Sequence, residues 1–329
     1  MGLSDLNNGP PETPEAYPKV CIVMSTYNGG KWLAQQMDSL VAQTWPNMCL
    51  YVRDDGSSDD TLDILATYQN KLEMTVSPGE NLGACDSFLQ AMADAPDDAG
   101  YYAFCDQDDI WFDDKIARSV EAVSSLDPDT PILLHSQQMV CDDNLGDQQP
   151  GRLPLIEATF ENALAGNIVT GCTVMIHTSA WQLLKTTRPR RKAIYIHDWW
   201  AYLVISLFGR IEFLASPTML YRQHTSNTSS RYHGNPIKQL YRAFKLFAGG
   251  QINAHTHRHV SELQHAFEDL LSEQQKNKLA LAADMVSAPG ALQRYKSLRQ
   301  LSPKQRTSAL QLFHMIGILV SPARDQRHG

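Results

Sequence analysis

The chain has 329 residues, of which 43% are hydrophobic and 19% charged, and its formal net charge at pH 7 is −8. This is the composition of a globular protein with enough apolar residues for a large core. No stretch approaches the roughly 18 consecutive apolar residues of a membrane-spanning helix, so the sequence predicts none.

The charge is unevenly distributed along the chain. Residues 236–329 carry 13 Lys and Arg against 6 Asp and Glu, a net charge of +7. The remaining residues, 1–235, carry 15 basic and 30 acidic side chains, a net charge of −15. Such an acidic body disfavours nucleic acid as a partner, and the basic part must serve a different purpose.

Residues 1–17 are polar and proline-rich, with neither a basic start nor an apolar stretch, so we expect a disordered leader rather than a secretory signal. After them, short apolar runs alternate with segments of helical period. Strands are predicted at 20–24, 49–55, 72–76 and 101–106, each followed by a helix. This alternation predicts an α/β fold with a mostly parallel sheet flanked by helices.

The second half is less regular. It predicts strands at 130–136, 210–214 and 218–224, a strand running into a helix across 167–184, and a helix at 197–209. Beyond them the pattern is helical, with breaks at glycine and proline. We therefore divide the chain into an α/β domain at residues 18–235 and a basic helical extension at residues 236–329.

Three polar loops follow predicted strands, at residues 25–30, 53–60 and 105–109. Ligands of open α/β sheets bind beyond the carboxyl ends of the strands, so we expect the loops to line one crevice. Taken alone, the acidic loop at 53–60 is equally well explained as a polar turn with a helix cap. The chain has neither a dinucleotide-binding glycine motif nor a P-loop.

Asp106 and Asp108 follow a predicted buried strand at alternating positions. Alternate side chains of an extended segment share one side, and paired carboxylates suit Mg²⁺ or Mn²⁺ together with substrate phosphates. An acidic helix start is the other explanation for such a cluster, and we accept it for Asp113 and Asp114.

Asp198 begins a predicted helix, where it is either an N-terminal cap or a general base. The adjacent His197 and the helix N-terminus are expected to lower its pKa. Trp200 is interpreted as core, whereas Trp199 packs in the core or stacks on a sugar. Arg222 is a candidate phosphate ligand, and His224 a candidate metal ligand that needs further support.

The six cysteines form no CxxC pair and lie mostly in apolar runs. They are interpreted as buried free thiols, which suits a reducing cytoplasm.

The motifs occur in a specific order: "VCIVMSTYNGGKW", "VRDDGSSDDT", "NLGACDSF", "FCDQDDIW", "TGCTVMI", "HDWW" and "YRQH". Together they resemble the family-2 inverting glycosyltransferases of the GT-A fold, over residues 18 to 230. Within them, "DQDDIW" and "HDWW" resemble the rhamnosyltransferase-like branch that builds O-antigen and other bacterial surface polysaccharides.

The resemblance implies a role for each site residue. Thr26, Tyr27 and Asn28 would line the nucleotide pocket, and Asp55 would accept from the pyrimidine ring. The others would act at the diphosphate or the acceptor: Asp106 facing ribose and metal, Asp108 binding the metal, His224 touching metal or diphosphate, and Asp198 serving as the base.

It also implies a metal-dependent hexosyltransferase that uses Mg²⁺ or Mn²⁺. The donor would be dTDP-rhamnose or a UDP-sugar, and the acceptor a saccharide or lipid-linked saccharide. Two alternatives stay open: a sugar nucleotidyltransferase, which would want more phosphate-binding cations than Lys31 after the first strand, and a non-catalytic nucleotide-sugar-binding scaffold, which would not need Asp198.

The segment 237–247 places apolar residues on one helical face beside Lys238, Arg242 and Lys245. Packing on the α/β domain is one explanation. Peripheral contact with the inner face of the cell membrane, where a lipid-linked acceptor would lie, is the other.

Overall fold

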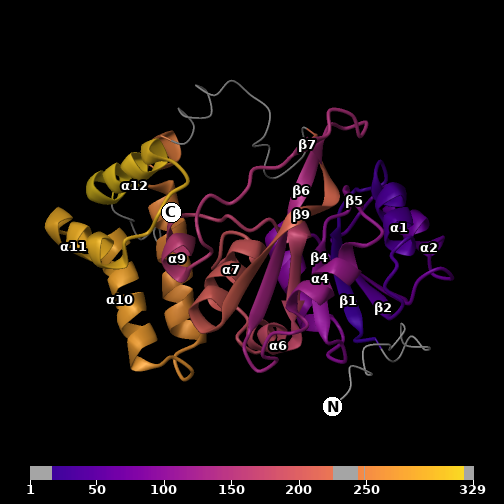
Figure 1. Cartoon of the computed structure of the whole chain (residues 1–329), viewed down its shortest axis with the longest axis horizontal. Helices are drawn as coiled ribbons and strands as arrows, with labels where there is room; N and C mark the ends of the chain where they lie inside the picture. Colours follow the sequence, from indigo (N-terminus) through magenta and orange to yellow (C-terminus); the bar gives the residue numbers. More distant parts are fainter. Residues whose placement is uncertain (1–16, 225–243, 248, 322–329) are drawn as a thin grey trace, which may run out of the picture.

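The computed structural model describes residues 17–224, 244–247 and 249–321. Their centre is a nine-stranded sheet of order β3-β2-β1-β4-β8-β6-β9-β5, with β7 paired to β6 (Figure 1). β1 to β4 run parallel, whereas β8 is antiparallel to both its neighbours. The strands are β1 (Val20–Thr26), β2 (Met48–Asp54), β3 (Met74–Pro78), β4 (Tyr101–Cys105), β5 (Ile110–Trp111), β6 (Ile132–Cys141), β7 (Gln149–Pro150), β8 (Val174–His177) and β9 (Arg210–Arg222).

Helices cover both faces of the sheet. Those of the α/β domain are α1 (Leu33–Val41), α2 (Thr61–Ala66), α3 (Ala84–Asp94), α4 (Lys115–Val123), α5 (Phe160–Ala165), α6 (Thr178–Thr186) and α7 (His197–Phe208), with the one-turn helix η2 (Gly171–Thr173). The C-terminal helices α9 (Gln251–Ala266), α10 (Glu273–Ser287), α11 (Ala291–Leu301) and α12 (Ser308–Val320) form one end of the molecule (Figure 1).

Alternation along the strands creates two cores. In β1, Cys21 and Val23 face a core shared with α3, α6 and α7. Ile22 and Met24 face the opposite core, which is shared with α1, α2 and α4. A run that is apolar at every position is what a strand covered on both faces requires, and all of these side chains are buried. The α/β fold predicted from the sequence is therefore confirmed.

The predicted strand boundaries differ most from the structure at β9. The segments 210–214 and 218–224, expected as two strands, form the single strand β9, which pairs with β6 over its length. Pro217, which lies between the two predicted strands, pairs with Gln137 at a register shift in the ladder. A proline is tolerated at such an irregularity because its missing N–H leaves no ladder bond unmade.

The C-terminal helices share the larger core with the α/β domain. Val260, Leu263 and Phe267 of α9 belong to the same apolar cluster as Trp200 and Leu203 of α7. Polar bonds add to this packing, because the Arg190 guanidinium donates to the buried Glu262 carboxylate at 2.6 Å. The extension therefore supports the helix that carries Asp198. Of segment 237–247, only residues 244–247 lie within the described part of the chain.

All six cysteines are free, as predicted, and five of them are buried. Directly before β1, the Lys19 ammonium forms ion pairs with the carboxylates of Glu73 and Asp98.

Buried histidines predict acid sensitivity. Burial lowers the pKa of His197 and His259 to about 3, and that of His135 and His314 to about 4. Below pH 6.5 the unfolded chain binds protons that the folded protein rejects, so the free energy of unfolding falls with pH, by up to about 1.4 kcal/mol per pH unit for each histidine.

We expect urea midpoints to fall between pH 7 and pH 5, and His314→Phe to reduce that fall. The exposed His265→Gln serves as the control. An unchanged pH dependence in His314→Phe would show that this histidine does not contribute.

Candidate active site

Loops from β1 and β2 meet at the carboxyl edge of the sheet. The Asn28 backbone N–H donates to Ser57 Oγ at 2.9 Å, and the Asn28 side-chain oxygen accepts from the Ser58 N–H at 2.8 Å. Asn28 has a positive φ of 46°, which asparagine tolerates better than most residues. The loops after β1 and β2 therefore lie together, as the sequence predicts.

The loop after β4 joins the same edge through Gln107. Its side-chain amide bonds both the N–H and the C=O of Tyr27, at 2.9 and 3.1 Å. A Cβ on Gly29 would lie 2.3 Å from the Gln107 Oε1, so a larger residue there would displace the Gln107 amide. Tyr27 is thereby held with 49% of its surface exposed. The sequence reasoning gave Gln107 no role.

The predicted nucleotide-binding residues differ in accessibility. Thr26 is fully buried at the end of β1, and its C=O accepts from the Asp55 N–H at 2.7 Å. The Asp55 carboxylate bonds the Arg53 guanidinium and the N–H groups of Leu82 and Gly83 at 2.8 and 2.9 Å. In this conformation Asp55 organises the loop after β3, and contact with a base stays a prediction.

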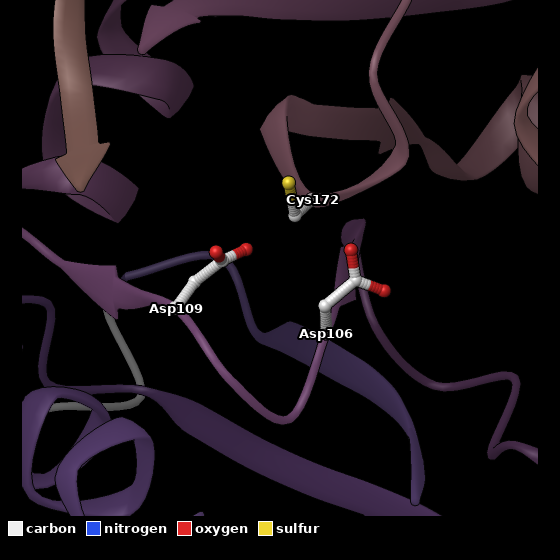
Figure 2. A group of neighbouring side chains, drawn as sticks. All are labelled: Asp106, Asp109 and Cys172. Carbon is white, nitrogen blue, oxygen red and sulfur yellow. The ribbon is translucent and has the colours of Figure 1, made fainter. Parts of the chain in front are cut away.

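Asp106, Asp109 and Cys172 form a cluster at the centre of the site. Figure 2 shows their side chains converging from the β4–β5 loop and from η2. One potential ligand atom from each lies within 4.8 Å of the other two. Asp109 is fully buried, and its Oδ2 has no hydrogen-bond partner among the described residues.

The electrostatics of the cluster are unfavourable in the absence of a cation. Burial and the nearby Asp108 and Asp198 raise the pKa of Asp106 to about 7. Burial, with Asp108 and Asp106, also raises the pKa of Asp109. Lys115 is close, but burial lowers its pKa to about 8, and its ammonium bonds the Cys172 C=O and Thr218 Oγ1. Paired buried carboxylates of this kind suit a divalent ion.

Asp108 points elsewhere. Its Oδ2 lies 2.7 Å from His224 Nε2, and the His224 ring stacks on Trp32 with centroids 4.0 Å apart. The sequence predicted Asp106 and Asp108 as the metal pair with His224 alongside. The structure instead brings Asp106 together with Asp109 and Cys172, because the chain turns directly after Asp106 rather than continuing as a strand.

Arg222 has a structural environment. Its side chain is 1% exposed and donates to the carbonyls of Asp108 and Asp143, at 2.8 and 2.5 Å, and to Gln35 Oε1 at 2.6 Å. In this structure Arg222 braces the loop that carries Asp108. Its use as a phosphate ligand stays a prediction.

Asp198 lies in the first turn of α7, as predicted, and is 7% exposed. Its Oδ2 accepts from the Gly171 N–H at 3.0 Å, and its Oδ1 accepts from the Trp199 N–H at 2.6 Å. Gly171 directly precedes Cys172, so the single turn η2 links this carboxylate to the acidic cluster. The sequence motif "TGCTVMI" contains Gly171 and Cys172, but the sequence alone does not indicate their roles, because only the fold shows which side chains they approach.

His197 does not act as expected. Its ring is buried and stacks on Phe88 with centroids 4.0 Å apart. Burial lowers its pKa to about 3, so it is neutral at pH 7 and adds no positive charge beside Asp198. The prediction that His197 helps to lower the Asp198 pKa is therefore wrong. Trp199 and Trp200 are both core residues, at 3% and 0% exposure, and neither is available to stack on a sugar.

Gly171→Ala tests how tightly Asp198 is positioned. A Cβ there would lie 3.1 Å from His197 Nε2, so the ring of the residue next to Asp198 must shift by a few tenths of an ångström. At 3.6 Å from Asp198 Oδ2 the Cβ would make an ordinary van der Waals contact. We expect turnover to fall by about tenfold while the fold persists, because catalysis is sensitive to small misplacements. Gly290→Ala, where the added Cβ meets nothing, is the control. Equal rates for the two variants would contradict the positioning role.

The sequence is similar to those of known glycosyltransferases. Residues 21–182 match the model of glycosyl transferase family 2. The chain is 25% identical to the dTDP-rhamnosyl transferase RfbG of Shigella flexneri, over 62% of this chain and 72% of the relative. It is 32% identical to the putative teichuronic acid biosynthesis glycosyltransferase TuaG of Bacillus subtilis, over 32% of this chain and 41% of the relative.

Two solved structures share the fold. Residues 1–349 of S. aureus TarS, in complex with UDP-GlcNAc, align with a TM-score of 0.56 and 17% identity, over 92% of this chain and 89% of that TarS fragment. The mannosyltransferase PcManGT of Pyrobaculum calidifontis, in complex with GDP-Man and Mn²⁺, aligns with a TM-score of 0.50 and 17% identity, over 92% of this chain and 87% of the neighbour.

Proposed function

We propose that this chain, which belongs to the family-2 glycosyltransferases, moves a sugar from a nucleoside-diphosphate donor to a saccharide hydroxyl with inversion at the anomeric carbon. One observation carries the proposal. The one-turn helix η2 holds the Asp198 carboxylate through Gly171 and, one residue later, completes the acidic cluster through Cys172. In this proposal the proton acceptor, Asp198, therefore lies next to the acidic cluster that would bind the diphosphate through a metal ion.

The acidic cluster suits a divalent ion, on the grounds of its unpartnered Asp109 oxygen and its mutually repelling carboxylates. Asp106 and Asp109 would hold the ion, with Cys172 beside them, and Asp108 and His224 are further predicted ligands. When bound, Mg²⁺ or Mn²⁺ would supply positive charge against the diphosphate. The Mn²⁺ in the PcManGT complex is consistent with this choice.

Asp198 acts on the acceptor in this scheme. Its carboxylate removes the proton from the acceptor hydroxyl as that oxygen bonds to the anomeric carbon. The bond from the anomeric carbon to the diphosphate oxygen breaks on the opposite face, and its electron pair leaves with the nucleoside diphosphate. The N–H groups of Gly171 and Trp199 fix the orientation of the carboxylate throughout.

For the donor we propose dTDP-rhamnose or a UDP-sugar, in a pocket formed by Thr26, Tyr27, Asn28 and Asp55. The half-exposed Tyr27 ring offers a stacking surface for a base. The likeness to the dTDP-rhamnosyl transferase RfbG favours rhamnose, and the UDP-GlcNAc bound to TarS keeps UDP-sugars open.

The acceptor we propose is a saccharide, free or lipid-linked, in surface polysaccharide synthesis such as that of O-antigen. We place the enzyme in the cytoplasm, as its six free cysteines favour, with peripheral contact at the inner face of the membrane. No helix in the described residues has the length and apolarity needed to cross a bilayer. A nucleotidyltransferase is disfavoured because Lys31 Nζ is paired with Asp143 at 2.6 Å.

Thermal shift with a panel of nucleotide sugars tests donor choice. A ligand that binds only the folded protein raises stability by about 2.7 kcal/mol at a concentration of 100 Kd. We expect dTDP-rhamnose with Mn²⁺ to raise the melting temperature more than UDP-glucose, UDP-GlcNAc or GDP-mannose, and Mn²⁺ alone to raise it less. No shift with any of them would contradict donor binding, and a larger shift with a UDP-sugar would reassign the donor.

A further inference from the structure

α12 has an apolar surface on its outward side as well as on its inward side. Its sequence, SALQLFHMIGILV, contains no Asp, Glu, Lys or Arg. Leu312, Ile316, Leu319 and Val320 fall within about 100° of one another around the helix, at 100° per residue. Leu312 is 47% exposed and Val320 is 70% exposed. We call these four residues the α12 outer face.

The residues just before α9 extend this surface. Phe244 and Leu246 are 39% and 40% exposed, and the Phe244 ring contacts Phe313 of α12 with centroids 5.2 Å apart. A helix that is apolar all round is normally buried on every side. The large side chains gathered here therefore indicate a surface that meets something apolar.

The inner side of α12 is rigidly held. The buried Arg294 guanidinium donates to the C=O groups of Ile318 and Leu319 at 2.7 and 2.5 Å, at the helix end where a cation is favourable. Asn253 Nδ2 donates to the C=O groups of Gly317 and Ser321 at 3.0 and 2.8 Å. The outer face is thus presented by a fixed helix rather than by a loose one.

The distribution of charge along the chain indicates which kind of partner the α12 outer face binds. Residues 236–329 have 13 basic and 6 acidic side chains, and Lys304 and Arg306 directly precede α12. The rest of the chain, with 15 basic and 30 acidic side chains, would be repelled by an anionic bilayer and would face away from it. A second copy would bring one basic surface against another. An anionic lipid surface is complementary both to the apolar face and to the net positive charge of residues 236–329.

We propose that the α12 outer face, with Phe244 and Leu246, docks the enzyme on an anionic lipid surface. α12 has 13 residues, so it is roughly 20 Å long at 1.5 Å per residue, too short to cross a bilayer and long enough to lie in its interface. This inference rests on the proposed function for its purpose, which is access to a lipid-linked acceptor. The docking itself is measured without catalysis.

Vesicle flotation tests the proposal. The full-length chain is mixed with phosphatidylcholine vesicles, with or without phosphatidylglycerol. We expect flotation with the anionic vesicles, weakened by salt and by omission of phosphatidylglycerol. Leu312→Glu combined with Val320→Glu should lower the partition coefficient at least about tenfold, since two apolar anchors are lost and two negative charges added.

Leu270→Glu is the matched control. Leu270 is 54% exposed, comparable to Leu312, and it lies in the turn between α9 and α10, at the end of these helices away from α12 (Figure 1). We expect Leu270→Glu to float like the unmodified chain. Leu312→Ser with Val320→Ser provides a second pair without added charge. The donor-induced thermal shift, measured on the same samples, reports on the proposed function independently of docking.

Each other outcome overturns the proposal. Equal flotation of the double variant and the control would place membrane binding elsewhere. No flotation of the unmodified chain, with a concentration-dependent dimer that the double variant abolishes, would assign the face to a second copy. No flotation, no dimer and a lower melting temperature of both double variants would mean that another part of the chain covers the face.

Discussion

Asp198→Asn is expected to lower turnover by about 10²- to 10⁴-fold, the usual contribution of a general base, while donor binding persists. The side-chain amide of asparagine is not basic, so it cannot take the acceptor proton, and it offers only one carbonyl oxygen. It also cannot accept from both the Gly171 and the Trp199 N–H. One of these N–H groups then loses its acceptor, which should cost about 1–3 kcal/mol of unfolding free energy.

The measurement is the initial rate at saturating donor and acceptor, with the donor dissociation constant determined separately by calorimetry. Asp86→Asn is the matched control, since Asp86 is also in the first turn of a helix and is 8% exposed, close to the 7% of Asp198. If Asp198→Asn turns over like the Asp86→Asn control, Asp198 is not the base, and Asp109 or His224 becomes the next candidate.

Asp106→Asn is expected to separate stability from activity. The ligand-free protein should become more stable, by up to about 4 kcal/mol at pH 8, because the change removes a buried charge repelled by its neighbours. The sign follows from the pKa of Asp106, which burial and the nearby Asp108 and Asp198 raise to about 7. A raised carboxyl pKa destabilises the folded protein at high pH, and the penalty shrinks as the pH falls from about 7 towards the ordinary carboxyl value.

The same variant should lose most transfer activity and most of the extra thermal shift that Mn²⁺ gives with the nucleoside diphosphate, because a neutral amide binds a hard cation poorly. Urea unfolding at pH 6 and pH 8 measures the first effect, and thermal shift with and without Mn²⁺ the second. Undiminished transfer by the unmodified enzyme in EDTA would rule out the metal requirement.

Comparison of Asp108→Asn with Asp109→Asn identifies the second carboxylate ligand. The spacing in the sequence favours Asp108, whereas the structure places Asp109 beside Asp106 and Cys172 and pairs Asp108 with His224. We expect Asp109→Asn to abolish the Mn²⁺-dependent shift more completely. The opposite order would restore the assignment made from the sequence.

Local sequence patterns were sufficient to predict the sheet and the edge of the sheet where the candidate site lies. The alternation of apolar runs with helical segments predicts the α/β sheet, because strands buried on both faces must be apolar at every position, as Ile22 and Val23 show. The rule that ligands bind beyond the carboxyl ends of parallel strands located the site. The position of Asp198 in the first turn of α7 was also predictable, because an apolar helical face begins directly after it.

Contacts between distant segments could not be read in this way. Gly171 and Asp198 are 27 residues apart, and Asp109 and Cys172 come from different elements, so their proximity depends on how the strands assemble. Burial likewise determines the environments of Arg222 and His197. The fold encloses the Arg222 guanidinium among carbonyl groups. It places the His197 imidazole against Phe88, where desolvation keeps the ring neutral. Sequence spacing specifies which side chains are available near a strand end, whereas packing decides which of them meet and which remain charged.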